Sequence, residues 1–247
     1  MTQNDRANIG ASSRAQEATV RDASEREALV LGDGPRIQPL RVDELTDDLL
    51  QMIVRMMQIN SALESREQEL LTDVMSHQSA VTATEAGLAT KLGNLPEIMR
   101  TMLRHPNLFA RQADIGLQLL SQGALSPRDR ELAILRIGWL CQAPYEWGEH
   151  VLIAKKLGIT SADIERITRG SDVPEWSEHE RAILRATEEL YENSMISDAT
   201  WTTLSKRLDD RQLIELPVLV GQYQAVAYYQ NSLRLRLHNG NSGLKAR

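Results

Sequence analysis

The stretch WLCQAPYEWGEH, residues 139–150, gathers most of the side chain types that can do chemistry. It holds the single cysteine of the chain, a tyrosine, two glutamates and a histidine. Four roles are open to such a cluster: a redox site, a metal site, an acid–base site, or the crowded but inert start of a buried helix. The residue types and their spacing separate these roles in part.

A redox site in this stretch would depend on Cys141, the only cysteine in the sequence. Thiol redox chemistry needs a thiolate and usually a second thiol that resolves the oxidised one. Cys141 has no such partner, and its setting in GWLCQ suits a small buried hydrophobic residue. A single cysteine also excludes an intramolecular disulfide and a structural zinc site made of several thiolates.

An acid–base site would use Glu146 and His150, which are four residues apart and therefore share one face of a helix. Histidine titrates near neutral pH, and a neighbouring carboxylate can orient it or tune it. Glu131 lies one predicted helix earlier, at the start of the apolar run ELAILRIGWL. Glu131 is either a charge favoured by the helix dipole or an acid whose pKa is raised in a dry pocket. The sequence leaves both readings of Glu131 open.

Two other interpretations use the same residues. A metal site could combine Glu131, Glu146 and His150, but the other four histidines are scattered along the chain, so we predict no bound metal. The plain alternative is a half-buried histidine that a helix neighbour satisfies. The residues alone favour that alternative over acid–base chemistry.

The helices that must position this cluster have clear start signals. Ser126 is a suitable N-cap, and Pro127 follows it at the first helical position. Pro144 cannot continue that helix but suits the first turn of the next one. We therefore predict two buried helices that are joined around residues 142–144, which brings Glu131 within reach of the face that carries Glu146 and His150.

Helical spacing of apolar residues dominates from Asp43 to about residue 237, so the predicted fold class is all-α. A break is expected at His105, because the residue before a proline avoids the α region. A capping box is expected at Ser177. The segment LPVLVG near the end could be a short strand, but its setting favours a long helix that Pro217 bends.

The chain divides into a polar N-terminal tail or linker over residues 1–42, expected to be flexible, and one helical domain over residues 43–240. The tail is either a species-specific extension without function or a segment that packs on a partner subunit. The chain is long enough to bury a real core.

The 247 residues carry a formal net charge of −6, which does not imply a nucleic acid surface. No apolar run is long enough to span a membrane, and the start lacks the apolar segment of a secretory signal. We therefore expect a cytoplasmic protein with a small-molecule substrate.

The segment SPRDRELAILRIGWLCQAPYEWGEHVLIAKKLGIT resembles the carboxymuconolactone decarboxylase family, which shares the helical bundle of the alkylhydroperoxidase D family. The hydroperoxidase branch has a glutamate, a Cys-x-x-Cys pair and a histidine four residues after the second cysteine. Glu131 and His150 match that pattern, but Ala143 and Glu146 occupy the cysteine positions, and Cys141 replaces neither. The resemblance therefore implies the alkylhydroperoxidase D-like fold without its thiol chemistry.

The resemblance also implies a cofactor-independent lyase, decarboxylase or isomerase that acts on a small acidic or lactone-like metabolite, as in aromatic catabolism. His150 would be the general acid or base, Glu146 would orient it or share its proton, and Glu131 would be a second acid. Tyr145, Trp147 and Arg136 are candidate substrate-binding residues. Arg136 would hold a substrate carboxylate, although an internal ion pair is an equal alternative.

The family's helical units commonly assemble, so a homo-oligomer, a trimer or hexamer, is expected. Two other functions stay open at this stage. One is a non-catalytic helical oligomer for binding or assembly, and the other is a residual thiol-dependent peroxidase that acts through Cys141.

Overall fold

The structure is a computed structural model of the chain, and it describes residues 20–44, 46, 49, 97–238 and 240–247. Its elements are α2 (Val20–Leu31), η1 (Val42–Glu44), α6 (Glu97–Met102), α7 (Pro106–Ser121), α8 (Pro127–Leu140), α9 (Pro144–Lys156), α10 (Ser161–Arg169), α11 (Glu178–Asn193), α12 (Asp198–Leu204), α13 (Asp210–Leu233) and η2 (Gly243–Lys245). These residues include no strand, which confirms the all-α prediction. The part of the predicted helical range that falls on residues 50–96 lies outside the described residues.

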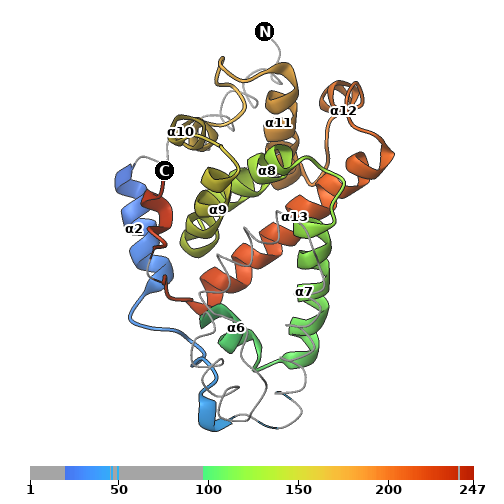
Figure 1. The fold of residues 1–247 in the computed structure, drawn as a ribbon. Helices are drawn as coiled ribbons and strands as arrows, with labels where there is room; N and C mark the ends of the chain where they lie inside the picture. Colours follow the sequence, from blue (N-terminus) through green and yellow to red (C-terminus); the bar gives the residue numbers. More distant parts are fainter. Residues whose placement is uncertain (1–19, 45, 47–48, 50–96, 239) are drawn as a thin grey trace.

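Helix α8 lies at the centre of the bundle and packs against α9, α11 and α13 (Figure 1). Every side chain from Asp129 to Trp139 is buried, so α8 has no solvent-facing side along most of its length. Charged groups in such a helix need partners inside the protein, because an unpaired buried charge is very costly. The partners of Arg130, Glu131 and Arg136 therefore determine much of the chemistry of the core.

The predicted connection between the two site helices is confirmed. Ser126 caps α8 by accepting a hydrogen bond from the backbone N–H of Asp129, and α9 begins at Pro144. Between the helices, Gln142 adopts a left-handed conformation with φ 47°. The backbone N–H of Ala143 then donates to the Gly138 carbonyl at 3.0 Å, which closes a compact C-terminal cap and fixes the direction of α9.

Other predicted helix limits are also confirmed. Helices α6 and α7 are separated at His105, which is the N-cap of α7. Ser177 forms a capping box with Glu180 at the start of α11. The segment LPVLVG belongs to α13, which is helical across Pro217, so the strand alternative is wrong. The bend expected at Pro217 stays a prediction.

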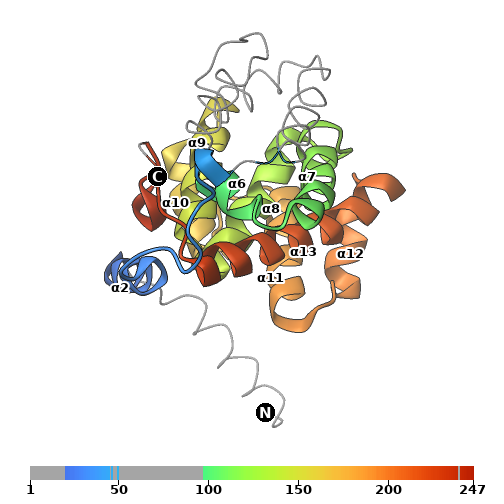
Figure 2. The ribbon, with the colours of Figure 1, turned by 90° about the horizontal axis from the view of Figure 1, so that it is seen from below.

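Helix α2 lies within residues 1–42, the range predicted to be a polar tail or linker. It lies beside the C-terminal segment in Figure 1 and at one edge of the molecule in Figure 2. Ala23 is buried in the core, and the Glu27 carboxylate accepts a hydrogen bond from the Leu244 N–H at 2.8 Å. Residues 20–31 thus form a helix that packs against the C-terminal segment. The few apolar residues of this helix do not indicate that distant contact from the sequence alone.

No helix in the described part of the chain combines the length and apolar character needed to cross a bilayer.

Candidate acid–base site

Helices α8 and α9 approach closely at Gly138. A Cβ atom at this position would lie 3.8 Å from Cγ of Glu146 and 3.8 Å from the Trp147 nitrogen. These are ordinary van der Waals distances, so the first turn of α9 lies directly against α8 at this position. Glu146 is therefore held beside the same helix that carries Glu131.

His150 lies between two carboxylates, in a group that we call the triad. Its Nδ1 is 2.7 Å from Oε2 of Glu131, and its Nε2 is 3.0 Å from Oε1 of Glu146. Exposed fractions are 0% for Glu131, 4% for Glu146 and 5% for His150. The geometry that the sequence predicted for these three residues is present, while their catalytic roles stay a proposal.

The two carboxylates require His150 to donate from both ring nitrogens, which only the charged imidazolium can do. Burial by itself lowers the pKa of His150. The charge of Glu131 and hydrogen bonds to both carboxylates oppose burial and raise the pKa from its ordinary 6.5 to about 10. His150 is therefore a buried cation at neutral pH.

The surroundings of Glu131 favour its carboxylate form, and its predicted role as a second acid stays a prediction. Complete burial raises its pKa, but the charges and hydrogen bonds of His150 and Arg130 together outweigh burial and lower it. Arg130 Nε lies 3.1 Å from Oε1 of Glu131. The dry pocket expected around Glu131 exists, but two cations line it, which reverses the direction of the pKa shift.

Helix α13 contributes two residues that the sequence analysis did not assign to the site. The Tyr223 ring meets the His150 ring edge-on, with centroids 4.9 Å apart and an interplanar angle of 89°. Gln230 Nε2 donates to Oε2 of Glu146 at 2.7 Å. The two residues are seven positions apart and so share one helix face. A glutamine on the buried, otherwise apolar face of α13 is the signal that could have revealed this contact.

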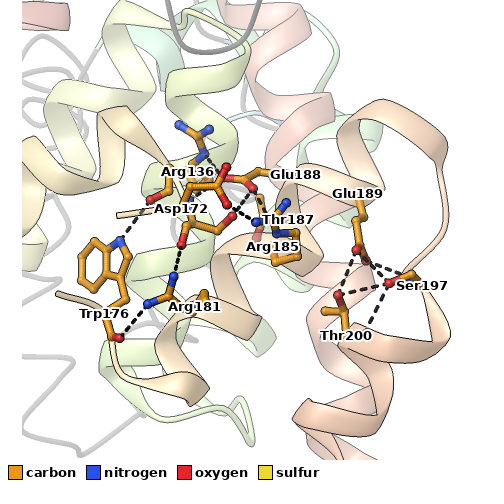
Figure 3. A network of polar contacts seen from close by, with 12 residues as sticks. Arg136, Asp172, Trp176, Arg181, Arg185, Thr187, Glu188, Glu189, Ser197 and Thr200 are labelled. Carbon is orange, nitrogen blue, oxygen red and sulfur yellow. Dashed lines mark hydrogen bonds and ion pairs between the residues drawn. The ribbon is translucent and has the colours of Figure 1, made fainter. Parts of the chain in front are cut away.

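The structure does not bring Arg136 to the triad. Its Nε lies 2.9 Å from Oε1 of Glu188 (Figure 3). Its Nη1 donates to the carbonyls of Ile167 and Thr168. Arg136 lies five positions after Glu131, which turns it to a different side of α8. The internal ion pair, the other interpretation of Arg136, is therefore present, and a role in binding a substrate carboxylate stays a prediction.

Trp147 and Tyr145 face the C-terminal segment. Trp147 packs on Trp139 with ring centroids 4.9 Å apart and donates from Nε1 to the Ala246 carbonyl. The Tyr145 ring lies edge-on to His238, and the Tyr145 carbonyl accepts a hydrogen bond from Asn241. Both residues thus connect α9 to the end of the chain, and their role in lining a substrate pocket stays a prediction.

Cys141 caps the C-terminus of α8 outside the triad. Burial raises the pKa of its thiol to about 12, and the negative charge of Glu146 adds to this effect. The thiol stays protonated at neutral pH and is a poor nucleophile. Within the described residues, no group of three His, Cys, Asp or Glu side chains has the arrangement of a metal site.

Residues 106–189 match the model of the carboxymuconolactone decarboxylase family. A peroxidase-related protein from Ralstonia eutropha JMP134 with an alkylhydroperoxidase AhpD core superposes with a TM-score of 0.55 at 15% identity, covering 74% of this chain and 94% of that chain. The debrominase Bmp8 without ligand gives 0.53 at 15% identity, covering 83% and 94%. Its complex with 2,3,4-tribromopyrrole gives 0.51 at 14% identity, covering 72% and 91%.

No curated protein matches the sequence. The structural neighbours establish the fold, and the family match spans the whole triad. Residues 106–189 are thus similar to the carboxymuconolactone decarboxylase family, and the chain has an alkylhydroperoxidase D-like fold.

Proposed function

We propose that the protein is a cofactor-independent proton-transfer enzyme, a decarboxylating lyase or an isomerase, acting on a small acidic or lactone-like metabolite. The observation that carries this proposal is the buried imidazolium of His150, held between two carboxylates at 2.7 and 3.0 Å. A group of this kind can deliver a proton and stabilise negative charge in the same position.

The two nitrogens of His150 have different tasks in this mechanism. Nδ1 stays protonated, because Glu131 accepts its proton in a hydrogen bond and Arg130 holds the other oxygen of Glu131. Nε2 shares the longer contact with Glu146, so it is the nitrogen that exchanges its proton. Glu131 and Arg130 thus orient the ring, and Glu146 moves the proton.

For a decarboxylation, the bond to the carboxylate carbon breaks, carbon dioxide leaves, and the electron pair remains on the adjacent carbon as an enolate. The imidazolium stabilises the enolate and gives its Nε2 proton to that carbon. For an isomerisation, Glu146 first removes a proton next to the carbonyl. A donor with a pKa of about 10 suits this task, because it keeps its proton until a strongly basic carbon forms.

Two contrary functions receive less support. A thiol-dependent peroxidase would need Cys141, whose thiol has a pKa raised to about 12 and no second cysteine to resolve it. A protein that only assembles does not need the triad and Arg130 as four buried charged groups, because charged groups are costly to desolvate. The debrominase and peroxidase-related neighbours are 14–15% identical and support only the fold.

The test is the exchange of carbon-bound hydrogen for deuterium in a panel of carboxylic acids and lactones, followed by nuclear magnetic resonance in deuterated water. Exchange or carbon dioxide release that depends on His150 and Glu146 is the expected result. His179→Gln is the matched control, because His179 is also buried beside a carboxylate but lies in another part of the core. A rate that survives His150→Ala would remove the proposal.

We also propose that the protein assembles with copies of itself. The outer face of α13 exposes Ile214, Val218, Gly221, Ala225 and Tyr228, at alternating spacings of four and three residues. This spacing is typical of a helix seam. Two antiparallel copies that cross at Gly221 would pair Ile214 with Tyr228 and Val218 with Ala225. Such a two-fold contact fits a hexamer and does not arise in a lone trimer.

Sedimentation of the wild-type protein should show a species heavier than the 27.8 kDa chain. Val218→Glu should shift the distribution toward smaller species, because it places a charge in the centre of the seam. Ile115→Glu, at an exposed apolar position of α7, is the control and should leave the wild-type distribution intact. A wild-type monomer at micromolar concentration would contradict the proposal.

A further inference from the structure

Gln230 has one amide atom that is fixed by the triad and one that has no hydrogen-bond partner among the described residues. It is only 3% exposed, and its Nε2 donates to Oε2 of Glu146 at 2.7 Å. A carboxylate oxygen can only accept, so the amide nitrogen and not the amide oxygen must face it. This contact fixes the orientation of the amide and turns Oε1 away from Glu146.

Gln230 Oε1 is buried and accepts no hydrogen bond within the described part of the protein. Most buried polar atoms in proteins are paired, so an unpaired one calls for an explanation. Five other side chain atoms share this condition among the described residues: Arg100 Nε, Thr101 Oγ1, Arg166 Nε, His179 Nδ1 and Asn231 Oδ1. Of these six residues in the described part of the chain, Gln230 is the one whose side chain forms a hydrogen bond with the triad. Gln230 is therefore the unpaired group that lies next to the chemistry.

We propose that Gln230 recognises a hydroxyl group of the substrate. Oε1 has free capacity for one O–H donor, and the same amide binds the carboxylate that exchanges a proton with His150. A hydroxyl bound there lies near the reacting carbon, so the substrate class is a hydroxy acid or a hydroxylactone. This inference rests on the proposed function and narrows it to hydroxylated substrates.

The adjacent Tyr223 supports this assignment. It lies seven positions before Gln230 on α13, and its ring meets the His150 ring edge-on. Burial, followed by the charges of Glu146 and Glu131, raises the pKa of the Tyr223 hydroxyl well above 10, so the phenol stays neutral. Helix α13 thus presents neutral polar groups to a site whose charges come from α8 and α9. Neutral groups of this kind discriminate hydroxyl groups without changing the charge balance.

The test uses two pairs of probes that differ by one hydroxyl: malate against succinate, and α-hydroxy-γ-butyrolactone against γ-butyrolactone. Binding by the wild-type protein is measured calorimetrically, and deuterium exchange is measured alongside. The hydroxylated member of at least one pair should bind about 10–100-fold more tightly, the range expected when a buried acceptor gains or loses its partner. Equal binding of both members in both pairs would mean that water alone fills the Oε1 position, and would overturn the inference.

Gln230→Met then assigns the preference to this residue, because methionine keeps the approximate shape and removes both polar atoms. The hydroxyl preference should fall to less than about threefold. Gln224→Met is the control, since Gln224 is a glutamine on the same helix that bonds to the Tyr228 hydroxyl at the surface. Gln224→Met should keep the full preference.

The outcomes separate this inference from the proposed function. A hydroxyl preference that survives in a folded Gln230→Met protein overturns the role of Gln230, even when His150→Ala abolishes exchange. If Gln230→Met does not fold, the wild-type comparison of the probe pairs still decides, because it needs no variant. If every triad variant keeps the exchange rate of the wild type while the hydroxyl preference is intact, the enzymatic proposal is overturned. The site would then bind a ligand without catalysing a reaction.

Discussion

His150 and His179 are both buried and both pair with a carboxylate, but only His150 has a carboxylate on each ring nitrogen. His179 Nε2 lies 3.1 Å from Oδ1 of Asp129, and its buried Nδ1 has no partner in the described residues. One acceptor needs one N–H, which a neutral imidazole supplies. Two acceptors need two N–H groups, and only an imidazolium carries both.

The second difference lies in what surrounds each carboxylate. Asp129 is in the first turn of α8, where the helix terminus favours a negative charge. Glu131, only two residues later, is fully buried and depends on Arg130 and His150 for neutralisation. A histidine and a carboxylate therefore form a simple contact between α11 and α8 at one site and part of a charge network at the other. The network is the part with properties suited to proton transfer.

The largest expected difference between the two sites is in turnover. His150→Ala and Glu146→Gln should each lower the rate of proton exchange by about 10²–10⁴-fold, the usual contribution of a positioned acid or base. The double variant should be little slower than the slower single variant, because groups that act as a unit are not additive. His179→Gln should stay within about twofold of the wild type. A similar loss in His179→Gln would show that the effect reports folding and not chemistry.

Stability should also distinguish the two carboxylates. Glu131→Gln leaves the buried Arg130 and His150 with a neutral partner, so the free energy of unfolding should fall by about 3–5 kcal/mol. Asp129→Asn retains a local hydrogen-bonding side chain near the end of α8 and should cost about 1 kcal/mol. Urea unfolding followed by the helical signal measures both values. Equal losses in the two variants would contradict the distinction.

The dependence of stability on pH should come from His150. Its pKa is raised from 6.5 to about 10 in the folded state, so its contribution is complete below pH 6.5 and is lost as the pH rises through 10. The Tm of the wild type should therefore fall more between pH 6.5 and 10 than that of His150→Gln. Parallel curves for the wild type and His150→Gln would reject the buried imidazolium.

The smallest effect is expected at Cys141. Its thiol is protonated at neutral pH and lies outside the triad, so Cys141→Ser should keep turnover within about twofold of the wild type. The measurement is the same exchange assay, with the helical signal as a check on folding. An activity that disappears only in Cys141→Ser would show that the reaction depends on the thiol and not on the triad.

The sequence predicted the parts of the site that depend on local rules. Ser126, Pro127 and Pro144 define where α8 and α9 begin, and the four-residue spacing places Glu146 and His150 on one face. These features involve neighbouring residues and short hydrogen bonds, which a sequence states almost directly. The predicted turn between the two helices indicated Glu131 as the third residue, and the resemblance then supported it.

The parts that failed depend on distant contacts. Helix α8 is buried on all sides, so spacing alone could not tell which neighbour Arg136 meets, and its partner Glu188 lies 52 positions away. Gln230 is separated from Glu146 by 84 positions, and Trp147 from Ala246 by 99. Helix α2 was missed for the same reason. The packed bundle determines which face of a helix contacts which other helix. A single sequence gives only the spacing of apolar residues along each helix.

The burial of the triad has a consequence for the ionic conditions under which the site can operate. Dissolved ions screen charges only where they can approach, over a Debye length of about 8 Å at physiological ionic strength. Arg130, Glu131, Glu146 and His150 are at most 5% exposed, so mobile ions do not enter the space between them. Added salt should weaken surface ion pairs such as Lys206–Glu178 long before it reaches this cluster. The protonation state of His150 is thereby insulated from the salt content of the surrounding solution.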